Sequence, residues 1–216
     1  MIKAYVFDAY GTLFDVHSAV TRHAAIVGEN PPRVSEIWRN KQLEYSWIRG
    51  LSKRYIDFWT ITEQALDFAL ASVPGSNLDC KQTLLDAYMT LDCYAEVPEV
   101  LSKLRARGAK TAILSNGSPD MLSAAVNSAK LDDVLDDQFS VDRIGMFKTD
   151  ASTYSIVTQS YGFDPQEIAF QSSNRWDIAG ASAFGFQCNW INRTNQPDEY
   201  HDLPPAETMP DLSGLI

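Results

Sequence analysis

The chain has too few cysteines for a disulfide-rich domain or a zinc-binding domain. Its 216 residues include three cysteines, Cys80, Cys93 and Cys188, and none of them forms a CxxC pair. An odd number of separated cysteines gives neither a disulfide framework nor the spacing of zinc ligands. We therefore expect reduced thiols, as in an intracellular protein.

Long hydrophobic runs are also missing. No stretch approaches the roughly 18 consecutive apolar residues that cross a bilayer. The first residues do not combine a basic region with a long apolar core, as a secretory signal does. The sequence therefore predicts a cytoplasmic protein without a membrane partner.

Positive charge is scarce. Lysine and arginine number 18 against 28 aspartate and glutamate residues, which gives a net charge of −10 and a pI of about 4.7. A nucleic-acid-binding protein presents a basic face, so nucleic acid is excluded as a partner. The acidity favours solubility, and an anionic substrate must be attracted by local positive groups.

Apolar residues are plentiful, at 45% of the chain, and are sufficient for a large core. Apolar segments predict buried strands, and each has a predicted helix beside it. The alternation predicts an α/β fold, with a Rossmann-like parallel sheet covered by helices on both faces. The predicted strands are 3–8, 110–115, 167–172 and 187–191, and the predicted helices are 97–107, 119–129, 151–161 and 177–184.

Residues 15–95 have a different character, with many aromatic and long side chains and no convincing strand. They predict an inserted helical cap domain, divided into helices at Pro31-Pro32 and Pro74-Gly75. The Rossmann-like core then comprises residues 1–14 and 96–216. The tail after Arg193 predicts loop with a short final element.

Polar residues follow three of the predicted strands. Asp8 follows the first, Ser115 and Asn116 end the second, and residues 172–174 end the third. In an open parallel sheet the ligand site lies at the carboxyl ends of the strands. We expect these side chains to meet there.

The first of these segments carries a single carboxylate. Asp8 is followed two residues later by Tyr10 and then by a glycine-containing turn. Two carboxylates at that spacing suit phosphoryl transfer, with one as nucleophile and the other as acid/base. A lone carboxylate suits attack on carbon, where the leaving group departs as a stable anion and needs no proton.

Four segments together resemble the motifs of the haloacid dehalogenase superfamily, and more narrowly the L-2-haloacid dehalogenases. The likeness spans nearly the whole chain, and the cap segment 38–45 shares it. The likeness has one departure: Thr149 follows Lys148 at a position where the family commonly has proline. The segments are Phe7-Asp8-Ala9-Tyr10-Gly11-Thr12-Leu13, Leu114-Ser115-Asn116-Gly117-Ser118, Lys148 and Ser172-Ser173-Asn174-Arg175-Trp176-Asp177.

The resemblance implies a hydrolase that removes halide from short L-2-haloalkanoic acids through an ester on Asp8. Lys148 is expected to pair with Asp8, because the nucleophile and the substrate carboxylate repel each other. Thr12 bonds Asp8 or its turn. Asp177 activates the water that hydrolyses the ester, and Ser172 and Asn174 position that water or the ester.

The resemblance also implies a substrate pocket. The carboxylate of the substrate is held by Ser115 and by backbone N–H groups at Ala9 and Tyr10. Arg39 meets both that carboxylate and the departing halide, and Asn116 donates to the halide. The remaining pocket residues implied are Leu43, Phe58, Tyr154 and Trp176. We expect no metal or organic cofactor. We expect the protein to form a homodimer.

Two other functions stay open at this point. One is a Mg²⁺-dependent phosphatase or phosphomutase of the same superfamily, since a fold does not fix a function. Tyr10 argues against it, because a phenol with a pKa near 10 is a poor acid/base at that position. The other is a non-catalytic binding protein, against which the presence of all four motifs argues.

Overall fold

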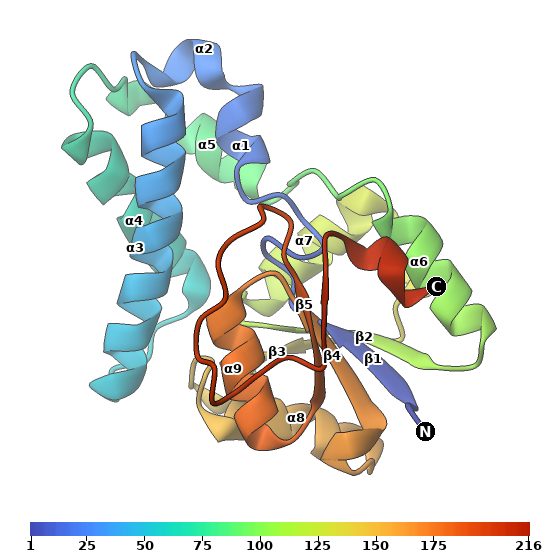
Figure 1. Cartoon of the computed structure of the whole chain (residues 1–216). Coiled ribbons are helices and arrows are strands. Elements are labelled where there is room, and N and C mark those ends of the chain that lie inside the picture. Colours follow the sequence, from blue (N-terminus) through green and yellow to red (C-terminus); the bar gives the residue numbers. More distant parts are fainter.

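A six-stranded, all-parallel sheet lies at the centre of the molecule, with the strand order β3-β2-β1-β4-β5-β6 (Figure 1). The computed structural model describes residues 1–216. β1, which leads to Asp8, lies in the middle of the sheet between β2 and β4. The strands are β1 (Ala4–Phe7), β2 (Lys110–Ser115), β3 (Asp137–Ser140), β4 (Ile168–Ser172), β5 (Gln187–Ile191) and β6 (Glu207–Met209).

The four strands predicted from apolar runs are present, but two further strands were missed. β3 and β6 are short, have polar sequences and form the two edges of the sheet. An edge strand pairs on one side only, and a short one needs little apolar sequence. β6 and a following 3-10 helix (Leu212–Leu215) lie in the tail that was predicted as loop with a short final element.

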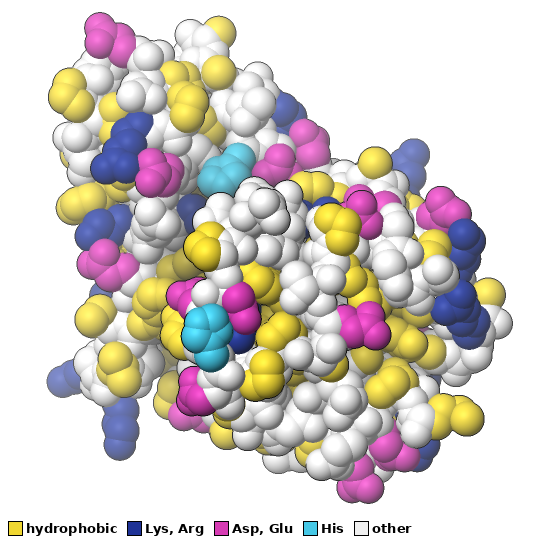
Figure 2. Space-filling view, viewed as in Figure 1, with side chains coloured by type: hydrophobic (Ala, Val, Ile, Leu, Met, Phe, Trp, Pro, Cys, Tyr) yellow, Lys and Arg dark blue, Asp and Glu magenta, His cyan; other side chains and the backbone are white.

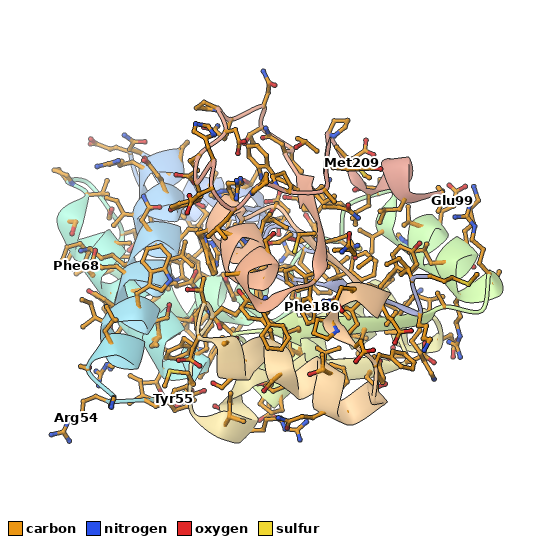
Figure 3. The ribbon with its side chains drawn as sticks, turned by 60° about the horizontal axis from the view of Figure 1, so that its bottom comes forward. Arg54, Tyr55, Phe68, Glu99, Phe186 and Met209 are labelled. Carbon is orange, nitrogen blue, oxygen red and sulfur yellow. The ribbon has the colours of Figure 1, made fainter.

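Four helices cover the sheet: α6 (Val97–Ala106), α7 (Pro119–Ala129), α8 (Ala151–Tyr161) and α9 (Arg175–Phe184). The chain moves from β1 outward to β3 and then from β4 outward to β6, in opposite directions. Right-handed crossovers therefore place α6 and α7 on one face and α8 and α9 on the other. On the second face Tyr154, Phe170 and Phe186 form an aromatic cluster, and Phe186 is labelled in Figure 3.

Between β1 and α6 the named elements are all helices, and they make a lobe beside the carboxyl end of the sheet (Figure 1). α3 begins at Pro31, and the Asn30 side chain accepts a hydrogen bond from the backbone N–H of Arg33. In Figure 3 the labelled residues Phe68 and Arg54 lie on this lobe. The predicted Rossmann-like core with an inserted helical cap is confirmed. The lobe contains α1 (Ser18–Arg22), α2 (Ala24–Val27), α3 (Pro31–Leu51), α4 (Phe58–Ser72) and α5 (Lys81–Tyr88).

A groove of about 890 Å³ runs between the carboxyl half of α3 and the core. Trp47 and Leu51 line it from the cap, and Met146, Trp176 and Leu203 line it from the core. Figure 2 shows apolar atoms gathered in the hollow between the two lobes. No helix of the chain combines the length and the apolar character that a bilayer crossing requires.

Candidate active site

Asp8 lies directly after β1 and is almost fully buried. Its backbone N–H donates to the carbonyl of Gln171, which continues the pairing of β1 with β4 by one residue. Its Oδ2 atom accepts hydrogen bonds from Asn174 Nδ2 at 2.8 Å, Thr12 Oγ1 at 3.2 Å and Ser172 Oγ at 3.5 Å. A carboxylate bound by this many donors keeps one orientation.

The turn after Asp8 requires glycine. Gly11 has φ of +93°, and a Cβ atom there would lie 3.1 Å from Ser173 Oγ. The Thr12 hydroxyl accepts a hydrogen bond from the Ser173 backbone N–H at 2.8 Å, so the turn is joined to the loop after β4. The N–H groups of Ala9 and Tyr10 have no acceptor within the chain, and such consecutive N–H groups suit an anion.

Lys148 lies between two carboxylates. Its Nζ atom is 3.2 Å from Asp8 Oδ1 and 2.8 Å from Asp177 Oδ2, and the three side chains are 1%, 8% and 0% exposed, respectively. Burial alone lowers the pKa of Lys148, but the carboxylates of Asp177 and Asp8 more than offset it and raise that pKa. The lysine is therefore a fixed positive charge at the centre of the site.

Asp177 lies in the first turn of α9 and is completely buried. Its Oδ1 atom accepts a hydrogen bond of 2.8 Å from the Tyr154 hydroxyl. Burial raises the pKa of Asp177 to about 6, although Lys148 opposes the rise. The helix begins two residues earlier than predicted, with Asn174 at its N-cap position, so Asp177 lies within the first turn and does not cap the helix.

Ser115 and Asn116 end β2 beside this cluster. Ser115 Oγ accepts a hydrogen bond from the Gly117 N–H at 3.0 Å, so the hydroxyl proton is left to donate elsewhere. Asn116 Oδ1 accepts from the backbone N–H of Lys148 at 3.0 Å. That bond fixes which end of the amide is oxygen, and leaves the NH₂ group of Asn116 as a donor.

Arg39 reaches this cluster from α3 of the cap. Its Nη2 atom donates to the carbonyl of Tyr10 at 3.2 Å and to Asn174 Oδ1 at 3.4 Å. Asn174 in turn donates to Asp8, so one amide side chain links the cap cation to the carboxylate of the core. The guanidinium adds a second positive charge close to Asp8.

Aromatic rings line the space between the cap and Asp8. The Tyr10 ring stacks on Phe58 and on Tyr88, with ring centroids 6.4 Å and 5.6 Å apart. Trp176 meets Trp47 of the cap edge to face, with centroids 5.6 Å apart. Leu43 is half-buried, one helical turn beyond Arg39 on the same face of α3.

The structure adds residues that the sequence reasoning did not select. Ser173 bonds Thr12, and the buried Tyr88 stacks on the Tyr10 ring and donates a hydrogen bond to the buried Gln42. Ser173 and Gln42 lie within segments that carry the family resemblance. That location is the only feature of the sequence that could have indicated a role in the site. No group of three or more His, Cys, Asp or Glu side chains gathers as a set of metal ligands.

The family of haloacid dehalogenase-like hydrolases matches residues 2–185 of the chain. The chain is 46% identical over 215 residues to (S)-2-haloacid dehalogenase 1 of Pseudomonas sp. strain CBS-3, covering 99% of this chain and 95% of the relative. It is 47% identical to the (S)-2-haloacid dehalogenase of Pseudomonas sp. strain YL, covering 100% and 93%.

A solved structure is also similar. It is the L-2-haloacid dehalogenase from Xanthobacter autotrophicus with chloropropionic acid covalently bound, with a TM-score of 0.90, 36% identity and coverage of 100% of this chain and 97% of that one. The chain belongs to the family of haloacid dehalogenase-like hydrolases. Within it, the named relatives are (S)-2-haloacid dehalogenases.

Proposed function

We propose that the protein is a hydrolase acting on carbon–halide bonds, which converts short L-2-haloalkanoic acids into D-2-hydroxyacids and halide. The observation that carries this function is the lone, buried carboxylate of Asp8 at the end of β1, with Tyr10 two residues on. The relatives are named for this activity, and chloropropionic acid is covalently bound in the Xanthobacter enzyme.

The first step is displacement of halide by Asp8. Oδ2 accepts three hydrogen bonds, whereas Oδ1 accepts one, from Lys148, and so keeps free lone pairs for attack. A bond forms between Oδ1 and C2 of the substrate, on the side opposite the halogen. The carbon–halogen bond breaks and the halide leaves with its electron pair. One displacement inverts C2, so an L substrate gives a D product.

The second step is hydrolysis of the ester on Asp8. Asp177 takes a proton from water, and the resulting hydroxide attacks the carboxyl carbon of Asp8. The bond from that carbon to the ester oxygen breaks, and the leaving alkoxide takes a proton from Asp177. Asp8 then holds one oxygen from water, and its proton passes to solvent. Tyr154 and Lys148 keep Asp177 oriented.

The substrate carboxylate is assigned to the Ser115 hydroxyl and to the N–H groups of Ala9 and Tyr10, all of which lack an acceptor within the chain. The halide is assigned to the NH₂ group of Asn116, to the guanidinium of Arg39 and to the edge of Trp176. Leu43 and Phe58 form an apolar wall around C2. Lys148 and Arg39 balance the anions that gather here.

The cap is assigned residues 15–95 and contributes Arg39, Leu43 and Phe58 to a site whose other residues belong to the core. We place the enzyme in the cytoplasm, in keeping with three free cysteines.

A homodimer is also proposed. Ile48 and Leu51 of α3 are 59% and 83% exposed, which is high for such side chains on a long helix. Leu51→Asp is expected to shift the sedimentation coefficient from dimer to monomer, whereas Leu78→Asp, at an exposed leucine elsewhere, is expected to leave it unchanged. Dimers in both variants would contradict an interface at this end of α3.

The function is tested by halide release from L- and D-2-chloropropionate in buffer with EDTA. Release from the L form only is expected, with Asp8→Asn losing at least about 10³-fold of the rate, because an amide is not a nucleophile here. Asp15→Asn is the matched control, since Asp15 bonds the His17 backbone outside the site. Phosphate release from phosphoesters with Mg²⁺, and no halide release, would overturn the proposal.

A further inference from the structure

We infer that Thr62, Gln42 and Tyr88 form a directional hydrogen-bond relay inside the cap that positions the guanidinium of Arg39. The inference rests on the proposed function, because it concerns the side chain that meets the substrate. The three residues come from α4, α3 and α5, and all of them are buried. Their meeting beneath Arg39 brings together segments that are distant in the sequence.

The distances form one continuous chain. The Thr62 hydroxyl donates to the backbone carbonyl of Phe58 at 2.8 Å. Gln42 Nε2 donates to Thr62 Oγ1 at 2.9 Å. The Tyr88 hydroxyl donates to Gln42 Oε1 at 3.3 Å. Arg39 lies at the far end: it is one helical turn before Gln42 on α3, and its Nη2 atom donates to the carbonyl of Tyr10, whose ring stacks on Tyr88.

The direction of each bond follows from the first one. A backbone carbonyl can only accept, so the Thr62 proton points to Phe58 and its oxygen is left as an acceptor. Gln42 must then present its NH₂ group to Thr62 and its oxygen to Tyr88. Tyr88 gives its one proton to that oxygen. The lone pairs of the phenol therefore remain for a donor, and the Arg39 guanidinium is a donor only.

Tyr88 is itself firmly placed. Its ring packs on Trp38, with centroids 5.0 Å apart, and on Tyr10, with centroids 5.6 Å apart. The Trp38 indole donates to the Thr62 carbonyl at 2.9 Å, so the relay and its packing share one helix turn of α4. On the side of the core, Arg39 donates to the carbonyl of Tyr10 and to Asn174 Oδ1. Arg39 is thus held between the core loop and the relay.

A purely structural role explains this network less well than the positioning of Arg39 does. Burying three polar side chains is costly unless all are hydrogen-bonded, and apolar residues of similar shape would pack without that cost. The network ends beside a charged group that the site uses. A reversed amide or a lost phenol oxygen would leave Arg39 facing an apolar surface on one side.

The first test removes single hydrogen bonds of the relay while keeping the shape of each side chain nearly unchanged. Tyr88→Phe and Thr62→Val are each expected to lower kcat/KM for L-2-chloropropionate about tenfold, chiefly through a higher KM, because Arg39 loses a fixed acceptor. Tyr161→Phe and Thr111→Val are matched controls. Tyr161→Phe loses the hydrogen bond to Asp137, and Thr111→Val loses those to the Val134 carbonyl and to Asp136. Both variants should keep kcat/KM within about twofold.

The second test asks whether the effect passes through Arg39. In an Arg39→Lys background, Tyr88→Phe is expected to change kcat/KM by less than about twofold, since the planar guanidinium that it positions is gone. The same loss in both backgrounds would overturn the relay, as would tyrosine and threonine variants that match their controls. No halide release by the wild-type protein would overturn the proposed function and the relay with it.

Discussion

The core and the cap contribute to the site in different ways. Asp8 in the core accepts hydrogen bonds on both oxygens, from Lys148 and from residues of two loops. Arg39 from the cap reaches the same place through bonds of 3.2 and 3.4 Å. The core therefore fixes the reacting carboxylate in advance, whereas the cap provides a cation through two longer hydrogen bonds.

The largest expected effect comes from removing the cation that the core buries. Lys148→Met leaves two buried carboxylates facing each other, so we expect at least about 10³-fold loss of halide release and about 3–5 kcal/mol of unfolding free energy. Urea denaturation measures the second quantity. Lys110→Met is the control: its ion pair with Asp136 is half exposed and should cost less than about 1 kcal/mol. Equal stability losses in the two variants would contradict a fixed core charge.

A smaller effect is expected from the cap. Arg39→Lys keeps the charge but loses the planar fork, so we expect kcat/KM to fall about 10–100-fold with little change in the free energy of unfolding. Arg33→Lys is the matched control on the same helix, because Arg33 pairs with Glu36 at the surface. Steady-state kinetics with thermal melts checks both. A fall in melting temperature as large as that of Lys148→Met would show that Arg39 has a structural role.

The pH dependence of ester hydrolysis tests the assignment of Asp177 as the base. A base works only when ionised, and burial raises the pKa of Asp177 to about 6. As the pH falls below about 6, the ionised fraction falls, so we expect ester hydrolysis to slow about tenfold per pH unit and to level off above pH 7. Rapid-quench measurement of ester decay tests this. A rate independent of pH between 5 and 7 would remove Asp177 as the base.

A variant of Asp177 separates halide displacement from ester hydrolysis. Asp177→Asn leaves Asp8 free to attack, so we expect release of about one halide per site and then a stop, as the ester accumulates. Continued turnover in this variant would show that another group activates the water.

The sequence predicted the parts of the fold that long apolar patterns encode. The four inner strands and the four helices of the core follow from such runs, and the convergence of Asp8, Ser115 and Asn174 follows from parallel topology. β3 and β6 were missed because Asp137–Ser140 and Glu207–Met209 are short edge strands. Their structure depends on the neighbouring strand rather than on their own pattern.

The site was less complete from the sequence because it depends on partners that are distant along the chain. The choice of Lys148 as a cation for Asp8 rested on charge balance, but its second partner Asp177 appears only in the structure. Gln42 and Tyr88 carry no motif of their own. Their contact depends on how α3 and α5 pack, which no local pattern encodes.

The most direct test of an ester on Asp8 is a single turnover in water that carries the heavy oxygen isotope, with enzyme in excess over L-2-chloropropionate. If Asp8 forms the ester, the product hydroxyl keeps ordinary oxygen, taken from Asp8, and mass spectrometry finds the heavy isotope in the peptide containing Asp8. Heavy oxygen in the product of that first turnover, with an unlabelled Asp8 peptide, would mean that water attacks C2 directly and would contradict the account.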